Sequence, residues 1–177
     1  MMKRWVIADL HFGHKNVIEY CNRPFATVEE MDAALICKWN SVVKNDDTVY
    51  VLGDFTLTRR MDTIKDLVSR LRGNKVLVMG NHDTRKPKDY IEAGFIQATR
   101  KPILLEPRLV LMHEPPEEED IWFRCNYIFG HVHDRKCAAD DYGNCVCVSA
   151  DRIDFTPVDL DELLKTMDAG RGPKYGD

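Results

Sequence analysis

Three apolar runs, separated by segments with helical periodicity, constrain the fold of this 177-residue chain most strongly. Each run is rich in β-branched residues and short enough for a buried strand. The runs lie in "RWVIADLHF" (4–12), "NDDTVYVLGDF" (45–55) and "KVLVMGNHD" (75–83). Strands that alternate with helices predict a parallel sheet with helices packed on it.

The two intervening segments have the marks of amphipathic helices. In "TVEEMDAALICKWNSVV" (27–43), Thr27 and Glu30 have the spacing of a capping box, and the apolar residues recur at helical intervals. In "MDTIKDLVSRLRGNK" (61–75), one apolar face is followed by Gly73, which favours a helix end. We predict helices over both segments.

In the second half of the chain the pattern of predicted elements changes. A short helix is expected around "PKDYIEAGF" (87–95) and a last helix in "DLDELLKTM" (159–167), with an acidic surface loop in "EPPEEEDIW" (114–122). We predict a single domain over residues 1–169 and a flexible tail over 170–177. Short strands are expected in "KPILLE" (101–106), "RLVLMHE" (108–114), "YIFGHVH" (127–133), "CVCVSA" (145–150) and "RIDFTP" (152–157).

Composition excludes several classes of protein. No apolar run approaches the ~20 residues that span a bilayer, and the N-terminal run is too short for a signal-peptide core, so we expect no membrane partner and a cytoplasmic protein. The six cysteines are expected to be reduced thiols in a chain of this size. A net charge of −4 does not favour long nucleic acid as a partner.

Polar residues gather where the predicted strands end, which is where open α/β sheets bind ligands. Singly, Asp9 or Asp54 would more often be a helix cap or turn residue, and His113 an ordinary half-buried histidine. Together, the carboxylates, amide and imidazoles suit borderline divalent ions, and their number suits two ions that share one carboxylate. The candidate ligands are Asp9, His11, Asp54, Asn81, His113, His131 and His133.

Five short motifs, in order along the chain, resemble those of the calcineurin-like metallophosphoesterase superfamily. They are "DLH", "GDF", "GNHD", "MHE" and "GHVH", and flanking segments further resemble a small bacterial and phage subgroup of that superfamily. The resemblance implies two mixed β-sheets packed face to face with flanking helices. It assigns one metal to Asp9, His11 and His133 and the other to Asn81, His113 and His131, with Asp54 bridging.

The resemblance also implies catalytic roles for the two residues after Asn81. His82 would be the general acid, and Asp83 would orient its ring. In-line hydrolysis of a phosphodiester needs an activated nucleophile and a proton for the leaving alkoxide. We expect a metal-bridging hydroxide to attack while a protonated histidine serves the leaving group. Manganese is the favoured metal, with iron, zinc, nickel or magnesium as alternatives.

Other polar residues are candidates for substrate contact. His14, in "HFGHKN", and Arg23, in "CNRPF", are predicted to bind the substrate phosphate, although His14 could equally be a surface-loop residue. Arg59 and Arg60 could either contact phosphate or begin an exposed helix.

The function we predict is metal-dependent hydrolysis of a small or nucleotide-type phosphodiester by a monomer or homodimer. Leu57 stands where phosphoprotein phosphatases of the superfamily carry an acid, which argues against that activity. Two alternatives stay open. One is a non-catalytic metal-binding scaffold of the same fold, and the other is a nuclease on longer nucleic acid.

Overall fold

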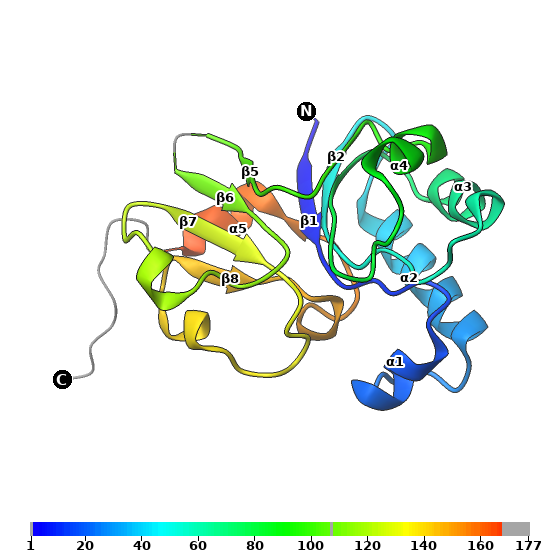
Figure 1. The fold of residues 1–177 in the computed structure, drawn as a ribbon, viewed down its shortest axis with the longest axis horizontal. Helices are drawn as coiled ribbons and strands as arrows, with labels where there is room; N and C mark the ends of the chain where they lie inside the picture. The colour runs from blue at the N-terminus through cyan, green and yellow to red at the C-terminus, as the bar shows by residue number, and fades with distance from the viewer. Residues whose placement is uncertain (1, 107, 168–177) are drawn as a thin grey trace.

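The computed structural model describes residues 2–106 and 108–167, and these form two mixed β-sheets with helices outside them (Figure 1). In the first sheet, four strands are parallel and the last runs antiparallel beside the first strand of the chain. Its order is β4 (Gln97–Thr99), β3 (Asn74–Val78), β2 (Thr48–Leu52), β1 (Arg4–Ile7) and β9 (Val158–Asp159).

The second sheet has four strands, of which only the first is antiparallel to its neighbour. Its order is β5 (Ile103–Leu104), β6 (Leu109–Leu111), β7 (Asn126–Phe129) and β8 (Cys145–Cys147). The prediction of an α/β fold with two mixed sheets and flanking helices is therefore confirmed.

Three helices cover the outer face of the first sheet, on the right in Figure 1. They are α2 (Val28–Val42), α3 (Met61–Arg70) and α4 (Pro87–Ala93). The side chain of Thr27 caps α2 by accepting a hydrogen bond from the amide of Glu30 at 3.1 Å, as the capping motif predicts. The Glu30 carboxylate accepts from the amide of Ala26 rather than that of Thr27. Buried Leu35 and Trp39 place the apolar face of α2 in the core.

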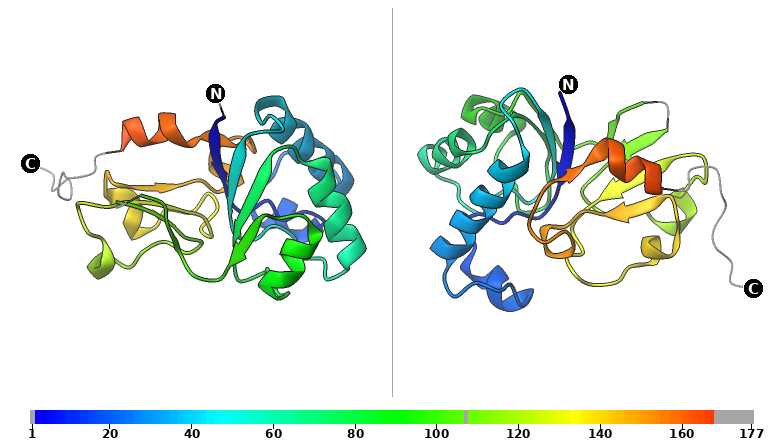
Figure 2. Two further views of the ribbon diagram at one scale, coloured as in Figure 1. Left: turned by 90° about the horizontal axis from the view of Figure 1, so that it is seen from above. Right: turned by 180° about the vertical axis from the view of Figure 1, so that it is seen from behind.

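A second core fills the space between the two sheets. Val6 and Leu52 of the first sheet pack in one cluster with Leu111 and Ile128 of the second, and α5 (Leu160–Thr166) contributes Leu160. Figure 2 shows α5 lying beside the second sheet. Burial of such side chains is the main favourable contribution to folding. It also holds the strand ends of the two sheets close together.

The sheets join directly just beyond β1 and β8. Ala8 forms a parallel bridge with Ser149, in which the Ala8 amide donates to Val148 O at 2.9 Å and the Ala150 amide donates to Ala8 O at 2.9 Å. This seam places residues after β1 beside residues from the second sheet.

The prediction of a strand in "RIDFTP" is wrong. Residues Ala150–Arg152 form a 3₁₀ turn, and Asp154 and Phe155 follow with left-handed φ angles of 49° and 56°, which no strand accommodates. A helix that we did not predict, α1 (Lys15–Tyr20), follows β1. The predicted tail, 170–177, lies outside the described residues.

Among the residues that the structure describes, no helix has the length and apolar character to cross a membrane. All six cysteines are free thiols, as predicted.

Candidate metal centre

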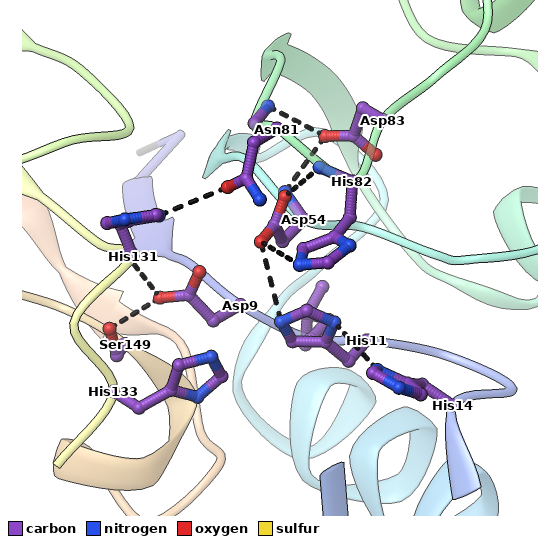
Figure 3. A network of polar contacts seen from close by, with 12 residues as sticks. Asp9, His11, His14, Asp54, Asn81, His82, Asp83, His131, His133 and Ser149 are labelled. Carbon is purple, nitrogen blue, oxygen red and sulfur yellow. Dashed lines mark hydrogen bonds and ion pairs between the residues drawn. The ribbon is translucent and has the colours of Figure 1, made fainter. Parts of the chain in front are cut away.

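Seven predicted metal ligands converge at the edge where the two sheets meet. Figure 3 labels all of them except His113. All of them lie on loops at the carboxyl ends of parallel strands, which point toward the same edge. Asp9 and His11 follow β1, Asp54 follows β2, Asn81 follows β3, His113 follows β6, and His131 and His133 follow β7.

The first cluster consists of Asp9, His11 and His133, whose potential ligand atoms lie within 4.8 Å of one another. Asp9 Oδ2 accepts hydrogen bonds from the His131 amide at 2.8 Å and from the Ser149 hydroxyl. Asp9 Oδ1 and His11 Nε2 are buried and have no hydrogen-bond partner among the described residues. Buried polar atoms are normally paired, so a cation bound between these two atoms accounts for both.

The second cluster consists of Asn81, His113 and His131. The Nδ1 atom of His113 donates to Leu52 O at 2.8 Å, so Nε2 carries the lone pair. That Nε2 lies 3.0 Å from Asn81 Oδ1 and 3.2 Å from His131 Nδ1. The three potential ligand atoms therefore face one point, as ligands of a single ion do.

Asp54 lies between the two clusters. Its Oδ1 accepts a hydrogen bond from the His82 amide at 2.9 Å, which leaves Oδ2 free. Asp54 Oδ2 is 3.5 Å from His11 Nε2 in one cluster and 3.6 Å from His113 Nε2 in the other. This is the position expected of a bridging carboxylate.

The backbone around the clusters is strained. Five of the seven candidate ligands have left-handed φ angles, which are uncommon for residues other than glycine. Such strain persists where the surrounding structure overrides it and is frequent at functional sites. The residues are Asp9 (57°), His11 (53°), Asp54 (52°), His131 (70°) and His133 (53°).

Glycine is needed at position 80 because a side chain would not fit there, and not because of the backbone angle. It is not among the glycines with positive φ, but a Cβ there would overlap the Asp54 carboxylate and the His113 ring. Gly130 is similar, since a Cβ would collide with the Asp9 carboxylate. These glycines let the loops approach closely enough for both clusters to form.

Burial disfavours the charged forms of the first-cluster residues. It raises the pKa of the Asp9 carboxyl and lowers the pKa of the His11 imidazole. A bound divalent cation offsets the penalty on Asp9 because it stabilises the carboxylate, and it uses the neutral imidazole of His11 as a ligand. The donor set thus suits a metal ion better than it suits an empty, solvent-free pocket.

His82 lies at the open side of the site and is not part of either cluster. Its side chain is 44% exposed, and its Nε2 is 4.0 Å from Asp54 Oδ2. The His82 ring lies edge-on to the His11 ring, with 5.3 Å between centroids. A histidine in this position can reach a group bound over the metals.

His14 lies next to these rings, at the start of α1. Its Nδ1 is 3.3 Å from His11 Nδ1, so one of the two nitrogens donates to the other. When His11 is the donor, its Nε2 lone pair is directed toward Asp54. His14 is thereby placed to orient a ligand, and it also lines a cleft beside the clusters. Its contact with the substrate phosphate stays a prediction. Arg59 and Arg60 are exposed and precede α3.

We predicted that Asp83 would orient the His82 ring, but the structure places its carboxylate elsewhere. Its buried carboxylate accepts hydrogen bonds from the amides of Gly80, Asp54 and Phe55 at 2.9, 2.8 and 3.1 Å. Burial raises the pKa of Asp83 to about 6 although these amides favour the carboxylate. Asp83 therefore fixes the loop of Asp54 to the loop of Asn81.

Arg23 is also placed differently from our prediction, because it is wholly occupied inside the protein. Its side chain is 0% exposed, forms a bidentate ion pair with Asp151 at 2.8 and 2.9 Å, and donates to the carbonyls of Asp9 and Leu10. A guanidinium with these partners holds the loop after β1 and has no free donor for a substrate.

Sequence reasoning missed Asp151, which supports a metal ligand. Its Oδ2 accepts from His133 Nδ1 at 2.7 Å, so the His133 Nε2 lone pair is left for a metal. Burial would raise the pKa of Asp151, but the hydrogen bonds from His133 and Arg23 outweigh it and lower that pKa. No spacing signal pointed to Asp151, which lies between the two predicted strands 145–150 and 152–157.

We expect Asp151→Asn to weaken metal binding at the first cluster by about 10–100-fold, since the amide supports His133 less well than a carboxylate does. The second cluster, which Asp151 does not touch, should keep its affinity. Calorimetric metal titration of the purified variant separates the two sites. Equal weakening of both sites would contradict the assignment, and Asp154→Asn, an exposed acid three residues away, is the matched control.

A family model described as calcineurin-like phosphoesterase matches residues 2–169. The chain belongs to this family. The family assignment agrees with the two groups of potential ligands, which are Asp9, His11 and His133 in one and Asp54, His113 and His131 in the other, and these are consistent with a dimetal site.

Similar proteins cover nearly all of this calcineurin-like phosphoesterase. An uncharacterized protein of Methanocaldococcus jannaschii is 34% identical over 178 residues, which span 97% of this chain and 94% of that protein. A protein of unknown function from Aquifex aeolicus has a similar structure, with a TM-score of 0.73, 27% identity and coverage of 93% of this chain and 99% of that one.

Two further similarities are partial. The gene 66 protein of Mycobacterium phage L5 is 43% identical over 89 residues, which are 49% of this phosphoesterase and 42% of the phage protein. A Pseudomonas putida nuclease has a TM-score of 0.50 and 22% identity, over 73% of this chain and 61% of the nuclease. At that identity the likeness to the nuclease concerns the fold alone.

Proposed function

We propose that this protein is a dinuclear metal-dependent phosphodiesterase that acts on a small or nucleotide-type substrate. The observation that carries the proposal is the pair of donor clusters joined by Asp54, with Asp9 Oδ1 and His11 Nε2 buried and unpaired among the described residues. The fold by itself does not require these two buried atoms to lack hydrogen-bond partners, whereas a metal site does.

Two divalent ions, when bound, supply a nucleophile at neutral pH and stabilise the charge that develops on the phosphoryl oxygens. The residues of the chain would hold these ions and orient the groups around them. Asp9, His11 and His133 would hold one ion, Asn81, His113 and His131 the other, and Asp54 would contact both. Asp83 and Asp151 keep the ligand loops in place through the buried hydrogen bonds described above.

His82 would serve the leaving group. In hydrolysis of a diester, a bond forms between the attacking oxygen and phosphorus, and the bond from phosphorus to the leaving oxygen breaks with its electron pair. A protonated His82 Nε2 would give its proton to that oxygen. Its exposure and its position beside Asp54 support this role.

Several features favour a small diester. Leu57 replaces an acid of the phosphoprotein phosphatases, and the net charge of −4 provides no overall attraction for a long polyanion. We propose manganese as the working metal. A non-catalytic scaffold has no need for an exposed histidine beside a complete ligand set, and on that ground we favour an enzyme.

Hydrolysis of bis-p-nitrophenyl phosphate and of p-nitrophenyl phosphate, each with manganese, nickel or magnesium, tests this proposal. We expect metal-dependent turnover with a preference for the diester. If neither ester were hydrolysed with any metal, the non-catalytic scaffold would be the better interpretation. A preference for the monoester would overturn the diesterase assignment. Binding of long DNA or RNA that falls steeply with salt would favour the nuclease alternative.

A further inference from the structure

A cleft of about 380 Å³ opens on the side of the metal centre that carries His82. Helix α1 provides one wall, with Tyr20, and the segment after β7 provides the other, with Arg135. His11, His82 and His133 form its floor, and Figure 3 shows these rings facing one another beside Asp54. A volume in the range of ~300–1,000 Å³ is typical of sites for small molecules.

Tyr20 presents an unusual amount of aromatic surface to this cleft. Its side chain lies at the end of α1 and is 74% exposed, and its hydroxyl has no hydrogen-bond partner among the described residues. An exposed aromatic ring on a cleft wall is a platform on which another ring can stack.

Arg135 brings a free positive charge to the opposite wall. Within residues 2–106 and 108–167 its guanidinium has no hydrogen bond or ion pair. Only its backbone is engaged, through its amide to Val132 O and its carbonyl to Arg152. The nearby Arg23 and Arg152 are both paired with carboxylates. A free guanidinium beside a phosphate-binding centre is suited to a second anion.

A second cleft, of about 360 Å³, lies on the other side of the centre, beside Asn81 and His113. Its arginine, Arg100, already donates to the carbonyls of Asp83 and Arg85, and Glu114 adds a negative charge. His82 does not line this cleft. The first cleft also has an acid, Asp134, so each cleft is lined by one arginine and one acid. The two sides of the centre therefore differ in the proton donor, His82, and in whether the guanidinium of the arginine is already hydrogen-bonded.

From this asymmetry we infer that the cleft between Tyr20 and Arg135 binds the leaving group, and that this group carries an aromatic ring and a second negative charge, as a nucleotide does. The inference rests on the proposed phosphodiesterase function, because the leaving oxygen must lie on the side of His82. Tyr20 stacks on the ring, and Arg135 binds the additional anion. The other substituent of the diester occupies the cleft beside Asn81.

Binding of three non-hydrolysable phosphonates to the manganese-loaded protein tests this inference by calorimetry. Methylphosphonate can occupy only the metals, benzylphosphonate adds a ring, and 4-(phosphonomethyl)benzoate adds a ring and an anion. We expect each addition to tighten binding by roughly threefold to tenfold, as for single stacking or charge-assisted contacts. Tyr20→Ala should remove the gain from the ring, and Arg135→Gln should remove only the gain from the carboxylate.

Lys136→Gln is the matched control, since Lys136 is a neighbouring exposed cation that pairs with Asp141 and does not line the cleft. It should keep both gains. Equal affinity of the wild type for all three phosphonates, or an equal loss in Lys136→Gln and Arg135→Gln, would overturn the inference while ester hydrolysis still proceeded. A wild type that hydrolyses no ester would instead overturn the phosphodiesterase function and the leaving-group assignment together.

Discussion

Asp54→Ala is expected to release metal from both clusters and to lower diester hydrolysis by about a thousandfold or more, which corresponds to roughly 4 kcal/mol of lost stabilisation. The reason is geometric. Asp54 Oδ2 lies within 3.5 and 3.6 Å of the facing histidine nitrogens of the two clusters, so no other carboxylate can replace it in both.

Elemental analysis after gel filtration measures the effect directly. The wild type should carry two ions and Asp54→Ala neither, while Asp141→Ala, which removes an exposed acid paired with Lys136, should carry two. Because Asp54 also accepts a hydrogen bond from the His82 amide, circular dichroism should accompany the analysis, and Asp54→Asn provides a variant of the same size. Two ions in folded Asp54→Ala would refute the bridging role.

His82→Ala is expected to lower turnover by about 10²–10⁴-fold without loss of metal, as is typical when a general acid is removed. Its side chain is 44% exposed and belongs to neither cluster, so the fold and the metal content should persist. The variant therefore separates proton transfer from metal binding.

Leaving groups of different basicity sharpen this experiment. Methyl p-nitrophenyl phosphate releases a weakly basic phenolate that needs little protonation, whereas methyl phenyl phosphate needs more. We expect His82→Ala to lose more activity on the phenyl ester than on the nitrophenyl ester. Equal losses on the two esters would argue that His82 positions the substrate instead of donating a proton.

The parts of the site that were predictable from the sequence are those at strand ends. Asp9, Asp54 and Asn81 each follow an apolar run, and parallel strands bring such positions to one edge, so their meeting follows from topology. The same holds for His113 and His131 in the second sheet. The roles of these residues remain predictions, whereas their convergence is observed.

The residues that were misread or missed depend on tertiary geometry. Arg23 and Asp151 are 128 positions apart and form a buried pair, which no local pattern announces. "RIDFTP" alternates like a strand, yet Asp154 and Phe155 within it have left-handed φ angles, and the Arg152 side chain pairs with Asp140 in another segment. Asp83 was predicted to be a partner of His82 only because the two residues are adjacent in the sequence. Its carboxylate instead turns inward to three backbone amides.

The bridge between Ala8 and Ser149 lies next to the proposed metal centre, so the centre is also a place where the two sheets are held together. One sheet supplies Asp9, His11, Asp54 and Asn81, and the other supplies His113, His131 and His133, so each proposed ion would cross-link the two sheets. The ions would add to the bridge at Ala8, the apolar core and the hydrogen bonds that already join the sheets, such as that from the His131 amide to Asp9. Occupancy would then set how readily the two sheets separate, and amide exchange at Ala8 and Ala150, which lie in the bridge, would measure this effect.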